Sequence, residues 1–221
     1  MLDVLGEAFP LAIGIALSPL PTIAIVLVLL APTGRRGGAA FLAARLVAVG
    51  AVVGVFAVVS DVVERSGEAG AAVAVTKIVV GAALLLVALK TWRGRPRAGD
   101  EPELPGWMSS IEGRTPGQSA QLAAVLTLAN PKELLLAIGA GIAIGSGGLP
   151  VGQTVVIATV LTVVACVNVI APVVAFLVAG ERVRAPLSSA RAALVRHNAT
   201  IMSVVLLVIA AVLVSGGVAD L

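Results

Sequence analysis

Long apolar stretches recur along the whole chain, and short polar connections separate them. A helix needs roughly 20 residues, at about 1.5 Å of rise each, to cross the hydrocarbon core of a bilayer. The stretches reach that length and are apolar on all sides, unlike the alternating strands of a membrane barrel. We therefore predict an all-α polytopic membrane protein with about six transmembrane helices, at 5–31, 38–59, 70–89, 118–145, 151–179 and 199–218.

Composition places the chain outside the range of soluble globular proteins. Hydrophobic residues make up 59% of it and charged residues only 12%, whereas a soluble domain has about 25% charged residues. The segment 1–7 contains acids but no Lys or Arg, so it lacks the positive region of a cleaved signal peptide. We therefore interpret the first apolar stretch as a retained span, and little sequence is left for a soluble domain.

The sequence contains no recognisable catalytic or metal-binding motif. Its one cysteine, Cys166, lies in an apolar stretch, so neither a disulfide nor a thiolate metal site can form within one chain. Its one histidine, His197, has no Asp or Cys motif beside it, and no phosphate-binding glycine loop occurs. We predict that the protein is not an enzyme and has no metal and no cofactor.

Basic residues are concentrated in alternate connections, whereas both termini are acidic. Because Lys and Arg favour the cytoplasmic side, we predict a multi-pass protein of the bacterial inner (plasma) membrane with both termini outside. The pI of about 9.8 then reflects loop charges near lipid headgroups rather than nucleic-acid binding. The basic residues of these connections are Arg35, Arg36, Lys90, Arg93, Arg95, Arg97, Arg114, Arg182, Arg184, Arg191 and Arg196.

The central connection divides the chain into two halves. It mixes Arg, Asp, Glu, Pro and Gly, as linkers do. We assign 1–91 to a first three-helix repeat, 92–117 to a cytoplasmic linker and 118–221 to a second three-helix repeat. Within the linker, the segment Pro105, Trp107, Met108 and Ile111 either lies in the membrane interface or is a solvated loop.

Proline interrupts the first span of each half near its middle. The motifs are Ser18-Pro19-Leu20-Pro21-Thr22 in the first span and Asn130-Pro131-Lys132 in the fourth. Three spans per half reverse the direction of the second half, so the pattern predicts two inverted repeats with broken helices 1 and 4, as in many transporters. Each half-helix after a break presents its positive end to the bundle centre. The alternative is that each proline only kinks its helix.

Ionisable residues inside spans are costly and therefore candidates for function. Lys132 lies roughly 20 Å from either end of its span, too far to reach the headgroups, so it needs a partner within the bundle, either a substrate anion or a cluster of carbonyl groups. Arg45 and Lys77 lie about two turns from a span end and either reach the headgroups or line the site. Glu133 does not share a helix face with Lys132 and is a candidate for proton coupling.

Two further features lie inside the spans. Asn168 and Pro172 form a polar, kinked point in the fifth span, where Asn168 either lines a cavity or makes an interhelical hydrogen bond. Glycine pairs permit close packing between helices or a homodimer. These pairs are Gly50 with Gly54 and Gly141 with Gly145.

Three motifs carry a resemblance to a known family. They are Ala16-Leu17-Ser18-Pro19-Leu20-Pro21, the loop from Pro105-Gly106-Trp107-Met108 through Thr115-Pro116-Gly117, and Asn130-Pro131-Lys132-Glu133 before a Gly/Ala-rich run. Over essentially its whole length the chain resembles the actinobacterial GAP/Sap proteins, the peptidoglycolipid- and sulfolipid-addressing proteins of the LysE-like superfamily. In that family Asn often follows the motif lysine, whereas here Glu133 does, which leaves the substrate more open.

The resemblance implies a transporter that exports or flips an anionic (glyco)lipid or a lipid-linked envelope precursor. Its expected partners are membrane lipids, a glycolipid or lipid-phosphate substrate, and the envelope-lipid synthesis or export machinery. The alternatives are a LysE/RhtB-like exporter of an amino acid or small ion, and a non-transporting scaffold for lipid export. The expected substrate-binding residues are Ser18, Pro19, Pro21, Thr22, Asn130, Pro131 and Lys132, with Arg45, Lys77 and Asn168 as further candidates.

Overall fold

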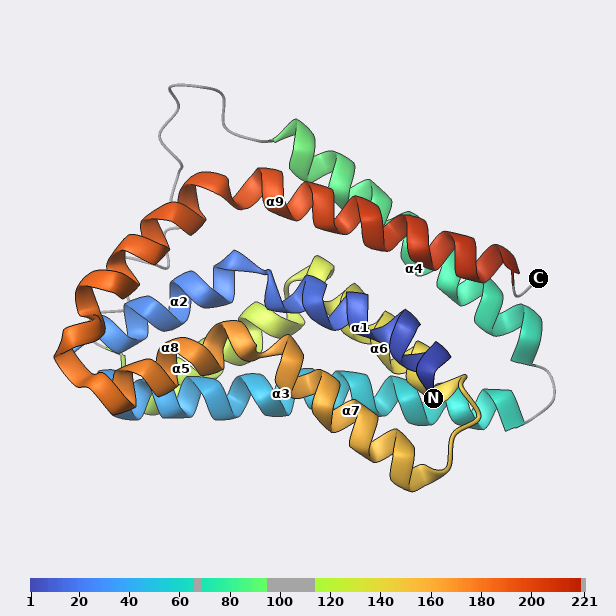
Figure 1. The fold of residues 1–221 in the computed structure, drawn as a ribbon, viewed down its shortest axis with the longest axis horizontal. Helices are drawn as coiled ribbons and strands as arrows, with labels where there is room; N and C mark the ends of the chain where they lie inside the picture. Colours follow the sequence, from blue (N-terminus) through green and yellow to red (C-terminus); the bar gives the residue numbers. More distant parts are fainter. Residues whose placement is uncertain (66–68, 95–113, 220–221) are drawn as a thin grey trace.

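The computed structural model describes residues 1–65, 69–94 and 114–219, and these residues form helices and no strand (Figure 1). The predicted interfacial segment around Trp107 lies outside the described residues. The helices are α1 (Leu2–Ala16), α2 (Pro19–Leu30), α3 (Gly34–Arg65), α4 (Ala69–Arg93), α5 (Pro116–Leu128), α6 (Pro131–Gly145), α7 (Val151–Ala165), α8 (Val167–Ala179), the 3-10 helix η2 (Gly180–Val183) and α9 (Arg184–Ala219).

Consecutive helices are bent against each other at the two predicted proline breaks. α1 and α2 meet at 46°, and α5 and α6 meet at 72°. Pro19 and Pro131 are the first residues of α2 and α6. A proline fits there because the amide of that position has no partner within its own helix.

A third bend, of 66°, separates α7 from α8. It falls at Cys166, two residues before Asn168, whereas Pro172 lies inside α8. The amide of Cys166 donates to the carbonyl oxygens of Thr162 and Val163, which ends α7 in a tight turn. The kink predicted at Asn168 and Pro172 is therefore displaced toward the N-terminus.

The number of membrane spans depends on how the bent pairs are counted. Among the described residues, Gly34–Val63 and Ala74–Arg93 are long and apolar enough to cross a membrane, and counting each bent pair as one span gives five. The sixth predicted span corresponds to Ser203–Val218, a shorter apolar stretch of α9. The start of α1 and the end of α9 lie at the same end of the molecule, as an even number of crossings requires (Figure 1). Six spans and an inverted repeat remain predictions.

The connection before the last predicted span differs from the expected loop. η2 and the first turns of α9 occupy it. Pro186 stands in the first turn of α9, where its missing N–H leaves no helical hydrogen bond unmade. The alanines that follow it favour a helix, so α9 starts well before its apolar part.

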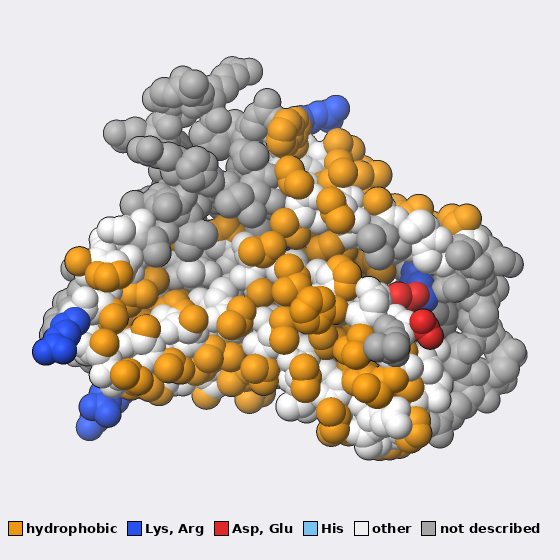
Figure 2. Space-filling view, in the orientation of Figure 1, with side chains coloured by type: hydrophobic (Ala, Val, Ile, Leu, Met, Phe, Trp, Pro, Cys, Tyr) orange, Lys and Arg blue, Asp and Glu red, His pale blue; other side chains and the backbone are white. Residues whose placement is uncertain are grey.

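The lateral surface of the described helices is largely apolar. Leu86 is 69% exposed and Val178 is 82% exposed. Figure 2 shows apolar side chains over the middle of one face, with charged side chains toward its edges. An apolar surface of this extent is a liability in water and is suited to lipid. The protein is therefore a membrane protein.

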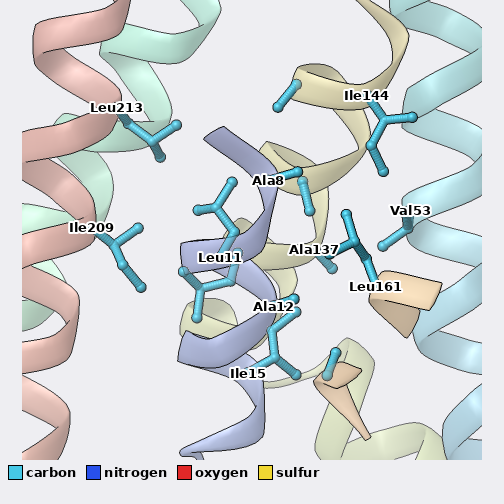
Figure 3. Close-up of a cluster of buried hydrophobic side chains, with 14 of the residues drawn as sticks. Ala8, Leu11, Ala12, Ile15, Val53, Ala137, Ile144, Leu161, Ile209 and Leu213 are labelled. Atoms are coloured by element: carbon cyan, nitrogen blue, oxygen red, sulfur yellow. The ribbon is translucent and has the colours of Figure 1, made fainter. Parts of the chain in front are cut away.

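The two largest clusters of buried apolar side chains lie on either side of Arg45. One joins α1, α4, α6, α7, α9 and the second part of α3. Figure 3 shows Leu11 of α1 at its centre, between Ile209 of α9 and Ala137 of α6. The other joins α2, α5 and α8 to Phe41 in the first part of α3. The breaks thus separate the core into two apolar halves.

Gly141 and Gly145 bring α6 against the backbone of α3. A Cβ atom at Gly141 would lie 2.6 Å from the carbonyl oxygen of Val53, and one at Gly145 would lie closer still to the carbonyl oxygen of Ala57. This is the close helix contact that the glycine pair predicts. By contrast, nothing lies within 4 Å of a Cβ atom at Gly54.

We expect Gly145→Ala to lower the free energy of unfolding by about 1–3 kcal/mol. The added methyl group would clash with the backbone of α3, which cannot rotate away as a side chain can. Gly54→Ala is the matched control and should be neutral or about 1 kcal/mol stabilising, because Ala favours a helix over Gly. Unfolding in detergent measures both. Equal stability of the two variants would contradict the close contact between α3 and α6.

Candidate functional site

Polar side chains from all three helix breaks meet at the level of Arg45 on α3. Ser18 lies at the first break, Asn130 at the second and Asn168 just after the third. Figure 1 shows the breaks near the middle of the molecule, between the two apolar halves. We call this group the polar layer, and it consists of Ser18, Thr22, Arg45, Thr127, Asn130, Lys132, Glu133 and Asn168.

A buried ion pair between Arg45 and Glu133 lies at the centre of the polar layer. Nη1 of Arg45 donates to Oε2 of Glu133 and, at 2.8 Å, to Oγ1 of Thr127. The Thr127 hydroxyl itself donates to the carbonyl oxygen of Ala123 at 2.9 Å. Arg45 is 0% exposed and Glu133 is 1% exposed. Arg45 therefore does not extend to the headgroups, which was one of its two predicted positions.

The second break positions Glu133 for this contact. Glu133 is the third residue of α6, so its carboxylate lies in the first turn, where the positive end of a helix stabilises negative charge. Arg45 reaches it from the middle of α3. Cys166, at the third break, lies close enough to interact electrostatically with both residues. The pair thus joins elements from both halves of the chain.

The pair leaves several of its own polar atoms without partners. Within the described residues, Nε and Nη2 of Arg45 and Oε1 of Glu133 are buried and make no hydrogen bond. A buried ion pair offsets the cost of desolvation only when its remaining donors and acceptors are satisfied. A stabilising contribution alone therefore does not explain the Arg45–Glu133 pair.

Asn168 connects the third break to the first. Its Nδ2 donates to the carbonyl oxygen of Ser18 at 3.0 Å and to Oγ1 of Thr22 at 3.1 Å. Thr22 also donates to the carbonyl oxygen of Ser18, at 3.2 Å. Oδ1 of Asn168 and Oγ of Ser18 are buried without a partner in the described part of the chain. Asn168 therefore makes an interhelical hydrogen bond and still has a free acceptor.

Lys132 is the second residue of α6 and is half-buried. Its ammonium group makes no hydrogen bond or ion pair with the residues that the structure describes. Glu133, its neighbour, faces Arg45 instead, as expected for successive residues of a helix. Nδ2 of Asn130, just before the lysine, is also buried and unpaired there. Lys132 thus adds a second positive charge to a layer with a single described carboxylate.

The remaining candidates have other surroundings. Nζ of Lys77 lies 3.1 Å from Oε2 of Glu7, whose side chain is 39% exposed. Glu7 precedes Ser18 by a distance of about 16 Å along α1 at 1.5 Å per residue, so Lys77 does not belong to the polar layer. Pro19 and Pro21 are buried at the start of α2, whereas Pro131 is exposed.

Thr127 is a polar-layer residue that the sequence did not single out. It is one of several threonines in apolar helices, and only its contact with Arg45 distinguishes it. The opposite charges of Arg45 and Glu133 were visible in the sequence, but their spans are not neighbours along the chain. No group of His, Cys, Asp and Glu residues that could hold a metal ion occurs among the residues described.

A separate apolar groove of about 300 Å³ lies between α4 and α9. Its walls are almost wholly apolar and it opens partly to the surface, so it is suited to a hydrocarbon chain rather than a headgroup. The groove is lined by Ala88, Leu89, Trp92, Ser203, Val204 and Leu207.

A family model described as Sap, sulfolipid-1-addressing protein, matches residues 9–219. The match includes every residue of the polar layer and both walls of the groove. Neither a curated protein nor a solved structure matches the chain.

Removing either partner of the Arg45–Glu133 pair should lower the free energy of unfolding by about 3–5 kcal/mol, because the other charge stays buried without compensation. The double variant Arg45→Gln/Glu133→Gln should lose clearly less than the sum of the single variants, as unfolding in detergent would measure. Glu7→Gln is the control and should cost less than either single variant, because the side chain of Glu7 is 39% exposed. Strictly additive losses would show that the two charges do not interact.

Proposed function

Because the chain belongs to the family described as Sap, sulfolipid-1-addressing protein, we propose that it is an inner-membrane transporter of an amphipathic lipid. It exports or flips an anionic (glyco)lipid or a lipid-linked envelope precursor. The headgroup binds in the polar layer at mid-membrane, and the acyl chains stay in the bilayer.

The unpaired ammonium group of Lys132 is the observation that carries this proposal. A charged side chain within a membrane span requires a partner, and Lys132 has none among the described residues. Arg45 and Glu133 compensate each other, so the polar layer has a surplus of positive charge. An anionic headgroup beside Lys132 supplies the missing negative charge.

The half-helices α2 and α6 support the same assignment. Both begin in the polar layer, and the unpaired amides and positive dipole of a helix N-terminus favour an anion. Unpaired Nδ2 of Asn130 and Oγ of Ser18 add donors at this level. An anion would therefore meet a lysine, two helix ends and neutral donors in one place.

The groove between α4 and α9 favours a lipid over a water-soluble substrate. It lies between two apolar helices and opens at their surface, whereas an exporter of amino acids or small ions needs a closed aqueous vestibule. A passive scaffold would not need an unpaired lysine among its helix breaks. The amino-acid exporter therefore leaves the groove without a role, and the scaffold leaves Lys132 without one.

Transport in this proposal follows alternating access between the two three-helix repeats, 1–91 and 118–221. Among the contacts between the repeats, those of Arg45 with Glu133 and Thr127, and of Asn168 with Ser18 and Thr22, lie in the polar layer. Opening of the layer toward either side would exchange these contacts for contacts with the headgroup.

We expect the purified protein in vesicles to move labelled anionic glycolipids or phospholipids between leaflets, and Lys132→Ala to slow this movement at least tenfold, which corresponds to about 1.4 kcal/mol. Lys90→Ala is the matched control, because Lys90 is an exposed lysine in the last turn of α4. Its rate should equal that of the wild type. If the wild-type protein moves no lipid, the amino-acid exporter or scaffold takes the place of this proposal.

A further inference from the structure

We propose that Glu133 is a proton-binding site, and that it binds a proton when an anionic headgroup binds to Arg45. This inference rests on the proposed function, because it concerns the same polar layer. It adds the proton as a second ligand, and it couples proton binding to lipid binding.

The geometry of the Arg45–Glu133 pair is the first support. The pair uses one nitrogen of the guanidinium and one oxygen of the carboxylate, although both groups can form two parallel hydrogen bonds. Nε and Nη2 of Arg45 are buried and unpaired among the described residues. They form the fork that binds a sulfate or phosphate group through two oxygens. Arg45 thus has free donors for a second anion.

Charge balance is the second support. Both members of the pair are fully buried, so each charge needs compensation from within the protein or from a ligand. With Arg45 bonded to Glu133, the pair is neutral. With a headgroup anion on Arg45 and a proton on Glu133, the pair with its two ligands is neutral again. The charge of Lys132 is the same in both states, so it does not alter this comparison.

The proton would be bound by the unpaired Oε1 of Glu133. This oxygen is buried and accepts no hydrogen bond from the described residues, so a carboxylic acid can form there without displacing a donor. The proton comes from water when the layer opens, and it returns to water when the headgroup leaves and Glu133 again bonds to Arg45. No other bond forms or breaks.

The surroundings of Glu133 leave few other groups able to bind this proton. α6 packs against α1, α3, α4, α5 and α7. α3 contributes Arg45, α6 itself contributes Lys132, and the junction after α7 contributes Cys166. α5 contributes only the hydroxyl of Thr127, while Glu7 of α1 and Lys77 of α4 pair with each other.

Reciprocal coupling follows from this arrangement. If a proton on Glu133 frees Arg45 for the headgroup, lipid binding must favour protonation by the same factor. The affinity for an anionic lipid should therefore rise as the pH falls through the range in which Glu133 becomes protonated. Above that range the carboxylate occupies Arg45 and competes with the lipid.

The test measures proton uptake by the full chain in detergent. Short-chain phosphatidylglycerol is the anionic probe and short-chain phosphatidylcholine the zwitterionic one, and calorimetry in buffers of different ionisation enthalpy reports the protons exchanged. We expect the wild type to take up protons as phosphatidylglycerol binds. The uptake should approach about one proton per bound lipid if lipid binding at Arg45 and proton binding at Glu133 are fully coupled. Phosphatidylcholine should cause no uptake.

Variants separate this inference from the proposed function. Glu133→Gln should bind phosphatidylglycerol without proton uptake and with an affinity independent of pH. If the single variant does not fold, the affinity of the wild type for phosphatidylglycerol is measured against pH, and it should rise as the pH falls. Glu7→Gln, the control carboxylate, should keep the wild-type uptake.

Two results would overturn the inference in distinguishable ways. Binding of phosphatidylglycerol to the wild type without proton uptake, or equal uptake by Glu133→Gln, rejects proton coupling and leaves the lipid site intact. Absence of any binding of the anionic lipid rejects the proposed function and this inference together.

Discussion

The absence of water from a bilayer interior is the constraint on which this structure depends. Backbone groups freed at a helix break, and charges placed beside it, must find partners within the protein or in a ligand. The fold collects its breaks at one level, where Arg45 donates to Glu133 and Thr127, and Asn168 donates to the carbonyl oxygen of Ser18. A break placed elsewhere in the apolar halves would have no such partner.

The same constraint divides the core. Apolar packing above and below the polar layer holds two sets of half-helices, each with its own buried cluster. Only α3 passes the layer unbroken while carrying one of its central charges. The half-helices of both chain halves are thus positioned against α3. Its backbone contact with Gly141 and Gly145 fixes α6, and therefore Glu133, at the level of Arg45.

Elements whose structure follows from local chemistry could be predicted from the sequence. The helix breaks at Ser18 and Asn130 follow from proline, and the glycine contact of α6 follows from missing side chains. The break at Cys166 could not be predicted, because no proline or glycine marks it. The partner of Arg45 could not be predicted either, because pairing between distant spans depends on their relative height and rotation. The family resemblance, which rests on contiguous motifs, is confirmed by a match over residues 9–219.

The imbalance between the two cations and the carboxylate of the polar layer links this structure to transport. A protein that needed only stability would replace a buried, half-satisfied ion pair with apolar side chains at little or no cost. The presence of Arg45, Lys132 and Glu133 at the helix breaks is therefore explained if an anionic headgroup binds to them reversibly. A headgroup bound to Arg45 would be released when Glu133 bonds to Arg45 again. The internal carboxylate then acts as the competitor that keeps an anion from being bound permanently.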